Sequence, residues 1–319
     1  MYQQLISFLV PICLALITFG IGISITLPQI REIYARPKGF LVALASQMLA
    51  LPLLAFAIAW AFEMPGYLRV GLVVLAASPG GSTAGFLTYL SRGNTALSIT
   101  LTSVNALLTL FTIPVVVNAA LWMFMGQRVD SIQLPFWHTV REILLVTILP
   151  AGLGVLARYR FEALATRVAS VAKPLLMLLL GLVFSLMLFG DGQPGMPTLS
   201  WEEAMEVLPW CLLLNVACMA EGFAFPWLFG LSYDVRITTA IESGVHNTTL
   251  AFLITINLLQ MPDLAKPVLV YALMSFWTAL LFVYAMRLLF GKGHLSEDIR
   301  WLTAFLGSLW RGGGAGNNS

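Results

Sequence analysis

Charged side chains are scarce in this chain of 319 residues, because Asp, Glu, Lys and Arg together make up only 10% of it. A soluble globular domain carries about 25%, so most of the surface of this protein cannot face water. Apolar residues make up 59% of the chain, and the mean hydropathy is +0.88. The lipid bilayer is therefore the solvent that suits most of the sequence.

Cysteine is rare in the chain, and the net charge is small. Cys13, Cys211 and Cys218 all lie in apolar runs, which favours buried thiols over disulfides. A formal net charge of +2 without any basic run argues against a nucleic-acid partner.

The first apolar stretch has no charged segment before it and no small-residue cleavage site after it. We therefore interpret it as a spanning helix rather than a removable signal.

Long apolar segments make up most of the sequence. A helix needs about 20 apolar residues to cross the hydrocarbon layer of a membrane. The qualifying segments are 5–27, 38–62, 67–91, 95–125, 136–157, 165–190, 204–230, 234–260 and 265–290. They predict an all-α polytopic membrane protein with nine transmembrane helices. Residues 295–310 predict a short interfacial helix within a cytoplasmic tail, 291–319.

Lys and Arg are distributed unevenly between the two sides of these segments. With the N-terminus outside, only Arg69, Arg128, Arg141 and Lys266 of the 17 basic residues lie on the outer side. An excess of Lys and Arg is typical of cytoplasmic loops. We therefore expect the N-terminus outside and the C-terminus inside, in a bacterial inner membrane.

The third segment contains the run Ser-Pro-Gly-Gly-Ser-Thr (78–83) near its middle. Proline removes a backbone donor, and glycine disfavours a helix. At membrane depth, freed backbone groups are tolerated only where protein or a polar cavity satisfies them. A simple packing kink is the alternative, since Gly and Pro are ordinary in membrane helices. The Pro-Gly-Gly triplet favours a functional break.

The eighth segment places Glu242, His246 and Asn247 around Gly244, also near mid-depth. A carboxylate at the bilayer centre costs about 2.5–3.5 kcal/mol on insertion scales, so it should face a cavity and have a partner. No basic residue lies centrally in any segment. The partner is therefore a bound cation, a proton or a polar side chain such as Gln47; a protonated structural Glu242 is the alternative.

The two breaks occupy corresponding places, each in the third member of a four-helix set. The odd segment between the sets gives the second set the opposite orientation, and such inverted repeats with paired discontinuous helices are typical of secondary transporters. Two helix N-termini, each carrying about half a positive charge, would point at one midplane site. A site with helix dipoles but no fixed cation suits an organic anion.

These residues also resemble a known family. SPGGSTAGFLTYLSRGNTALSITLTSV (78–104) resembles the crossover-helix signature of the bile acid:sodium symporter family, and IESGVHNTTLA (241–251) resembles its second crossover, usually Glu-x-Gly-x-Gln-Asn. Gln47, Asn215 and the stretch GLSYDVR match as well. The resemblance covers nearly the whole chain and identifies it as similar to a nine-helix member with altered sodium-site residues.

The resemblance implies a core domain, about 38–125 and 204–290, and a panel domain, about 5–27 and 136–190. Substrate would bind between them and cross by alternating access. Sodium would drive uptake of an organic anion such as a bile acid, a steroid sulfate or a small carboxylate, without any other cofactor. The resemblance does not specify the oligomeric state.

The resemblance also assigns site residues. One sodium ion would bind Glu242, Gln47, the main chain of Ser243 and Val245, and the position held by His246. A second would bind Glu242, Ser98, Thr102 and the positions held by Ala84 and Gly85. Substrate would bind at the helix starts and in the last segment, at Ser82, Thr83, Asn247 and Thr278.

Three departures from the family pattern affect the coupling ion. Ala84 and Gly85 offer no side-chain oxygen, so we expect the second sodium site to be weakened or absent. His246 replaces an amide oxygen with a group that titrates near neutral pH. It either shares a proton with Glu242 or forms a hydrogen bond as Gln would. Sodium coupling, proton coupling and uncoupled transport therefore remain open.

Other functional classes fit less well. His138 lies near the start of the segment 136–157 and His294 lies in the predicted tail, and no second ligand cluster accompanies Glu242 and His246, so an intramembrane metalloenzyme has little support. Nothing resembles a selectivity filter, which argues against a channel. We therefore predict a transporter rather than an enzyme.

Overall fold

The computed structural model describes residues 2–24, 37–81, 83–126, 133–164 and 199–290, with side chains from Pro11 onward. Within these ranges the chain is helical apart from its connections and one isolated β-bridge. Five helical stretches are long and apolar enough to cross a membrane: Pro37–Ala61, Thr95–Met125, Phe136–Arg160, Trp201–Leu228 and Pro262–Phe290. This agrees with an all-α polytopic membrane protein. The predicted segment 165–190 and the tail 291–319 lie outside the described residues.

The N-terminal half of the chain follows the predicted segments closely. The elements are α1 (Tyr2–Ser24), α3 (Pro37–Ala45), α4 (Leu51–Ala61), α5 (Gly66–Ala77), α6 (Ala84–Leu90), α7 (Thr95–Met125), α8 (Phe136–Ile143) and α9 (Leu149–Arg160). α3 runs directly into α4, and α8 into α9, whereas α5 and α6 are separate. α7 continues as one helix through Pro114.

The C-terminal half consists of two long helices on either side of a broken one. Its elements are α11 (Trp201–Leu228), α12 (Tyr233–Gly244), α13 (Thr248–Phe252) and α14 (Ala265–Phe290). α13 continues as a π-helical segment, Leu253–Leu258, and a short 3-10 turn, Pro262–Leu264, precedes α14. The described helices therefore include two interrupted pairs, α5–α6 and α12–α13.

The joins within α3–α4 and α8–α9 are π-helical turns, Ser46–Ala50 and Leu144–Ile148, which the sequence reading did not predict. Each turn is followed by a Leu-Pro pair that opens the next helix. Proline clashes with the carbonyl four residues earlier and lacks an N–H, so a local widening of the helix accommodates it. One consequence is that Gln47 lies on a widened turn.

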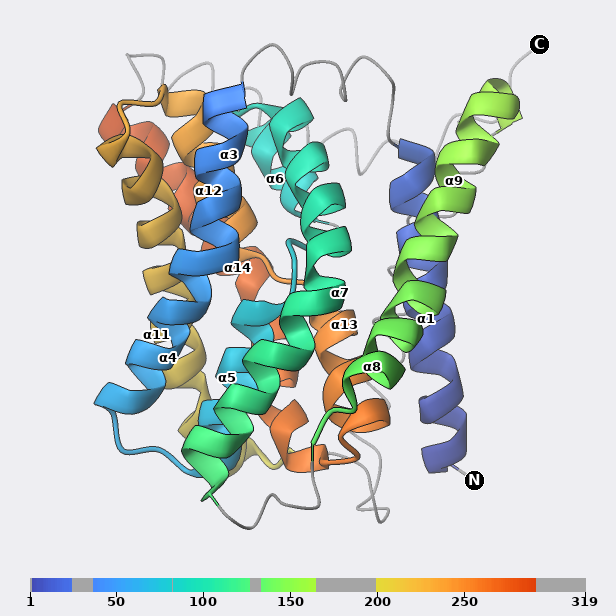
Figure 1. The fold of residues 1–319 in the computed structure, drawn as a ribbon. Helices are drawn as coiled ribbons and strands as arrows, with labels where there is room; N and C mark the ends of the chain where they lie inside the picture. Colours follow the sequence, from blue (N-terminus) through green and yellow to red (C-terminus); the bar gives the residue numbers. More distant parts are fainter. Residues whose placement is uncertain (1, 25–36, 82, 127–132, 165–198, 291–319) are drawn as a thin grey trace, which may run out of the picture.

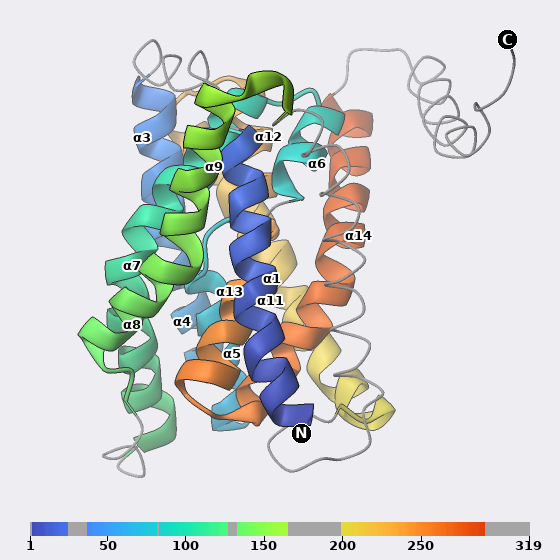
Figure 2. The same cartoon turned by 90° about the vertical axis from the view of Figure 1, so that its right-hand side faces the viewer.

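The helices form two groups, which Figure 1 shows side by side and Figure 2 shows from the side of the smaller group. A peripheral group contains α1, α8 and α9, and a main group contains α3 to α7 and α11 to α14 (Figures 1 and 2). α1 packs along α9, while the groups meet where α8 contacts α7 and α1 contacts α13. In Figure 1, α9 diverges from α7 toward the end of the bundle where α3 begins.

Small residues bring α1 and α9 together. A Cβ on Gly154 would overlap the carbonyl of Phe19 and would lie 2.9 Å from the Ile23 nitrogen and 3.0 Å from the Gly22 Cα. Because such contacts leave no room for a side chain, the two backbones approach closely, as is usual for small residues at helix interfaces in membranes. The peripheral group is therefore held by backbone-to-backbone packing.

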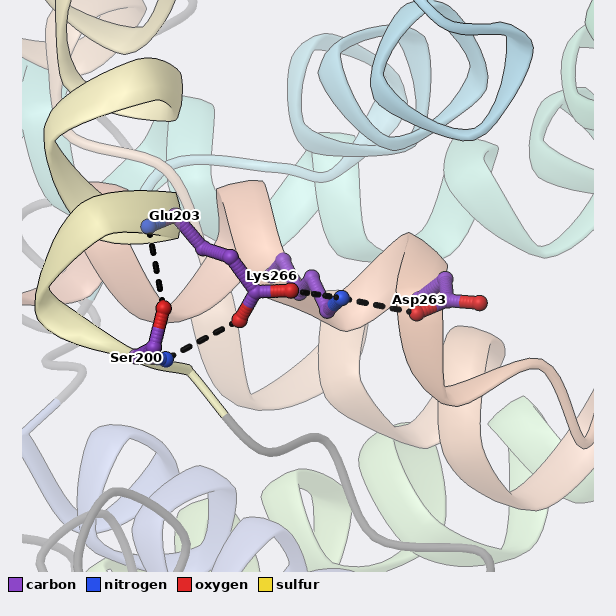
Figure 3. Close-up of polar contacts among 4 residues, drawn as sticks. All are labelled: Ser200, Glu203, Asp263 and Lys266. Atoms are coloured by element: carbon purple, nitrogen blue, oxygen red, sulfur yellow. Dashed lines mark hydrogen bonds and ion pairs between the residues drawn. The ribbon is translucent and has the colours of Figure 1, made fainter.

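Polar contacts join α11 to α14 at the end of the bundle where both helices begin (Figure 3). Ser200 and Glu203 form a capping box at the start of α11. The Lys266 Nζ lies 2.8 Å from the Glu203 carboxylate and 3.0 Å from the Asp263 carboxylate. At the opposite end, Lys38 Nζ donates to the Phe229 carbonyl at 2.9 Å, which links α3 to the end of α11.

The α1–α9 packing predicts opposite effects for two glycines of α9. Gly154→Ala should lower the stability by about 1–3 kcal/mol through overpacking against α1. Gly152→Ala should be neutral or slightly stabilising, because a Cβ there meets no atom within 4 Å and Ala favours a helix over Gly by about 1 kcal/mol. Thermal unfolding of the detergent-purified variants measures both. Equal melting temperatures for the two variants would contradict the close α1–α9 contact.

Candidate functional site

The two predicted breaks meet inside the bundle. The chain leaves the helix between Ala77 and Ala84 and again between Gly244 and Thr248. The Gly81 N–H donates to the Val245 carbonyl at 2.6 Å, and the Asn247 N–H donates to the Pro79 carbonyl at 2.8 Å. An isolated antiparallel bridge pairs Gly80 with His246. Backbone groups freed by one break are thus satisfied by the other.

Glycine is required at this crossing because the two segments approach closely. A Cβ on Gly81 would lie 2.8 Å from the His246 carbonyl oxygen. A Cβ on Gly80 would overlap a carboxylate oxygen of Glu242. The Pro-Gly-Gly triplet therefore both ends α5 and leaves space for the second break.

Two side chains satisfy the end of α12. The Gly244 carbonyl accepts hydrogen bonds from Asn215 Nδ2 and from the Tyr271 hydroxyl, each at 2.7 Å. Asn215 Nδ2 and the Tyr271 hydroxyl are themselves 2.9 Å apart. Both residues are fully buried. The sequence reading noted Asn215 but missed Tyr271, because a lone tyrosine in an apolar segment gives no sign of its partner.

Glu242 lies beside the crossing and is 1% exposed. Its carboxylate accepts hydrogen bonds from the Ser98 hydroxyl and, at 2.9 Å, from the Thr102 hydroxyl. Ser98 and Thr102 are four residues apart on α7 and so face the same way. The structure therefore brings together three of the residues assigned to the second sodium site.

The two remaining positions of that set offer no side-chain oxygen. Ala84 is fully buried, and a Cβ on Gly85 would lie 3.7 Å from the Ser98 hydroxyl. Gly85 thus adjoins the Ser98–Glu242 pair without contributing a ligand. A hard cation prefers several oxygen ligands, so this donor set fits sodium poorly.

The residues assigned to the other sodium site carry several buried polar atoms without a hydrogen-bond partner among the described residues. These are Nε2 of Gln47, the hydroxyl of Ser243 and both ring nitrogens of His246. The main chain of Ser78 lies near the imidazole, but no hydrogen bond of good geometry forms. The His246 ring also packs against Tyr271, with centroids 5.3 Å apart. Unpartnered buried groups of this kind call for a ligand or ordered water.

Asn105 on α7 belongs to the same region, although the sequence reading did not single it out. Its Nδ2 donates to Oε1 of Gln47. Both side chains are buried, and Oδ1 of Asn105 has no hydrogen-bond partner among the described residues. An asparagine inside an apolar segment could have been found as a candidate by its polarity, but only the fold shows that it contacts Gln47.

A cavity of about 190 Å³ lies between the peripheral group and the crossing. Among the residues that line it are Thr18 of α1, Thr147 of the π-helical turn before α9, Ala151 of α9, Thr102 of α7 and Asn247. Pro79 and Gly80 of the first break also line it, and none of the lining residues is charged. The cavity is thus uncharged and bordered by hydroxyl, amide and apolar groups.

The residues predicted to hold substrate are placed differently from one another. Asn247 lines the cavity, and its side chain also accepts from the Leu250 N–H at 3.0 Å as the N-cap of α13. Thr83 and Thr278 are not among the lining residues. The Thr278 hydroxyl bonds the Met274 and Ser275 carbonyls of its own helix. Ser82 lies outside the described residues.

Comparison with known proteins identifies a family for this chain. The family model described as Sodium Bile acid symporter family matches residues 11–193. The human sodium/bile acid cotransporter 4 is 29% identical over 239 residues, which cover 74% of this chain and 53% of the relative. The chain therefore spans about half the length of this relative. The uncharacterized sodium-dependent transporter YocS of Bacillus subtilis (strain 168) is 26% identical over 246 residues, covering 77% of this chain and 73% of the relative.

A plant protein is similar over a comparable length. The probable chloroplastic sodium/metabolite cotransporter BASS1 of Arabidopsis thaliana is 26% identical over 254 residues, which cover 80% of this chain and 60% of the relative. These relatives differ in the solutes that their names give, bile acid or metabolite. All three names include sodium.

The contacts at Gly244 predict a stability effect. Tyr271→Phe should destabilise the protein by about 1–3 kcal/mol, because it removes one of two donors to a buried carbonyl and also a partner of Asn215. Tyr284→Phe, on the same helix but 49% exposed, should change the stability by less than about 0.5 kcal/mol. Denaturant or thermal unfolding in detergent measures both. A Tyr271→Phe variant as stable as the wild type would show that this cap is dispensable.

Proposed function

Because the chain belongs to the sodium bile acid symporter family, we propose that it is a secondary active transporter of a small organic anion, coupled to sodium. The observation that carries the proposal is the uncharged cavity at the meeting point of two broken helices, next to the buried Glu242. Substrate sites of secondary transporters lie at such interrupted helices. The proposal makes the protein a carrier rather than an enzyme.

The transporter is proposed to have nine membrane spans arranged as an inverted repeat with two crossing helices. The peripheral group of α1, α8 and α9 would form the panel domain, together with the predicted segment 165–190. The main group would form the core domain. The position of the cavity, with α1 and α9 on one side and the crossing on the other, supports this division. Rocking of one group against the other would then expose the cavity to each side in turn.

The proposed orientation is N-terminus out and C-terminus in, within a bacterial inner membrane. It places the start of α3, and the Lys38–Phe229 contact, on the cytoplasmic side. The contacts of α8 with α7 and of α1 with α13 would close the outer side.

The chemistry of the cavity favours a small anion. The Thr147 hydroxyl, which has no hydrogen-bond partner among the described residues, and the amide of Asn247 can donate hydrogen bonds, while charged partners are absent from the lining. The N-terminus of the α13 helical segment adds a partial positive charge near Asn247. At about 190 Å³ the cavity is smaller than drug-sized pockets of about 300–1,000 Å³. A small carboxylate therefore fits this arrangement better than a bile acid or a steroid sulfate.

The donor sets differ in how well they suit sodium. Gln47, Glu242 and the main chain of Ser243 and Val245 supply oxygen atoms, and the Ser243 hydroxyl has no hydrogen-bond partner among the described residues, which leaves an oxygen for a cation. Sodium bound there would neutralise Glu242 and so link ion occupancy to the crossing that borders the cavity. The set with Ala84 and Gly85 lacks two side-chain oxygens. We therefore propose one sodium site rather than two.

A proton-coupled or uncoupled carrier is the second candidate, and His246 is the observation that favours it. Imidazole nitrogen is a weaker ligand than oxygen for a hard cation such as sodium, and both ring nitrogens lack a hydrogen-bond partner among the described residues. Proton symport would acidify the vesicle interior during uptake. Sodium symport would not.

The direct test uses proteoliposomes loaded with a pH dye. Radiolabelled small carboxylates, taurocholate and a steroid sulfate are each presented with an inward sodium gradient or with choline in its place. We expect sodium-dependent accumulation of a carboxylate without internal acidification. Equal uptake in choline would reject sodium coupling, and accompanying acidification would establish the proton-coupled alternative.

Substitution of Glu242 predicts loss of coupling. Glu242→Gln should reduce concentrative uptake at least 100-fold, because the neutral amide cannot balance a bound cation, while the protein still inserts in the membrane. Glu221→Gln is the matched control: Glu221 is the acid bound to the Ser46 hydroxyl, and glutamine retains an acceptor for that bond. Full accumulation by the Glu242→Gln variant would remove Glu242 from the coupling role.

A change at His246 distinguishes the two candidate functions. His246→Gln restores an amide oxygen, so the sodium concentration for half-maximal uptake should fall. Under proton coupling the same variant should instead lose uptake driven by a pH gradient. Uptake assays at varied sodium and at varied external pH measure the two outcomes separately.

A further inference from the structure

One face of α7 carries a row of polar residues. Ser98, Thr102, Asn105 and Thr109 follow one another at intervals of four, three and four residues, which places them on the same side of a helix. Ser98 and Thr102 donate to Glu242, and Thr109 bonds the Ala106 carbonyl of its own helix. Asn105 is fully buried and differs from its neighbours, because half of its amide has no partner.

The amide pair of Asn105 and Gln47 leaves an oxygen free in whichever way it is oriented. As placed, Asn105 Nδ2 donates to Gln47 Oε1, and the Asn105 oxygen and the Gln47 nitrogen lack hydrogen-bond partners among the described residues. Turning both amides over would reverse the donor and leave the Gln47 oxygen free instead. Turning over only one of the two amides would place two oxygens or two NH2 groups against each other. The pair therefore always leaves one amide oxygen free, and in the orientation that the structure shows this oxygen belongs to Asn105.

The surroundings favour a cation as the missing partner. Asn105 lies one turn from Thr102, which donates to Glu242, so the carboxylate that a cation would neutralise is close by. The hydrogen bonds to that carboxylate come from two neutral hydroxyls. A bound cation would interact favourably with the carboxylate and at the same time use the free amide oxygen. A bound anion would be repelled.

We propose that Asn105 supplies an amide oxygen to a sodium ion held between Gln47 and Glu242. It would replace the side-chain oxygen that the site lacks because His246 offers ring nitrogens, and hard cations prefer oxygen ligands. The inference rests on the proposed sodium coupling. It adds a ligand from α7, so that the ion ties α7 and the π-helical turn of Gln47 to α12.

The test measures sodium binding directly, without transport. The purified full chain is titrated with sodium against choline at constant ionic strength, and thermal stability is followed for the wild type, Asn105→Ala, Asn105→Asp and Asn118→Ala. Asn105→Ala should raise the sodium midpoint at least tenfold. Asn105→Asp should lower it at least threefold, since a carboxylate in a ligand position binds sodium more tightly.

Asn118→Ala is the matched control on the same helix. Asn118 bonds the main chain of Leu134 in both directions, at 2.9 and 3.0 Å, so its loss should lower stability in choline and leave the sodium midpoint unchanged. The Asp variant gives an independent result if the Ala variant does not fold.

Three results would overturn the proposal. A wild-type chain without any sodium-dependent shift would reject sodium coupling and the Asn105 ligand together. A wild-type response with an unchanged midpoint in Asn105→Ala would reject the ligand alone. A midpoint in Asn105→Asp as high as in Asn105→Ala, or unchanged from the wild type, would show that Asn105 only orients Gln47.

Discussion

The rest of this structure depends on the mutual satisfaction of two broken backbones. A break at membrane depth exposes N–H and C=O groups that lipid cannot satisfy, at a cost of several kcal/mol for each group. Here the loop of Pro79 to Gly81 and the loop of Val245 to Asn247 bond one another, and Asn215 and Tyr271 cover the remaining carbonyl of Gly244. Neither break would be stable without the other. The crossing therefore fixes where Glu242 and Asn247 lie.

The sequence was sufficient to predict the features that a single residue or a short motif causes in its own segment. Pro-Gly-Gly interrupts a helix wherever it occurs, so the break after Ala77 was predictable, and the cluster around Gly244 marked the second. The matching positions in two four-helix sets also predicted that the breaks would lie together. Ser98 and Thr102 could be assigned to one helix face from their spacing alone. Their contact with Glu242 was expected only from the family resemblance.

The sequence did not predict contacts in which a side chain meets a partner from a distant segment. Asn105, Tyr271 and the Ser46–Glu221 pair are single polar residues in apolar segments, and helical periodicity does not say which neighbour each one faces. The π-helical turns were missed for another reason: Leu-Pro pairs predict a strained helix, but strain can be relieved by a kink or by widening. Gln47 lies on one of these widened turns and there contacts Asn105.

The packing on the two sides of the cavity differs in a way that bears on movement. α1 and α9 pack backbone against backbone at Gly22 and Gly154, and backbone hydrogen bonds hold the two broken segments of the crossing together. Between the two groups, by contrast, lies a cavity lined by uncharged side chains, and the helices of the two groups meet at one end. A change of conformation should therefore occur between the groups rather than inside either one. Because sodium would bind within the main group, its binding energy could stiffen the crossing without obstructing that relative motion.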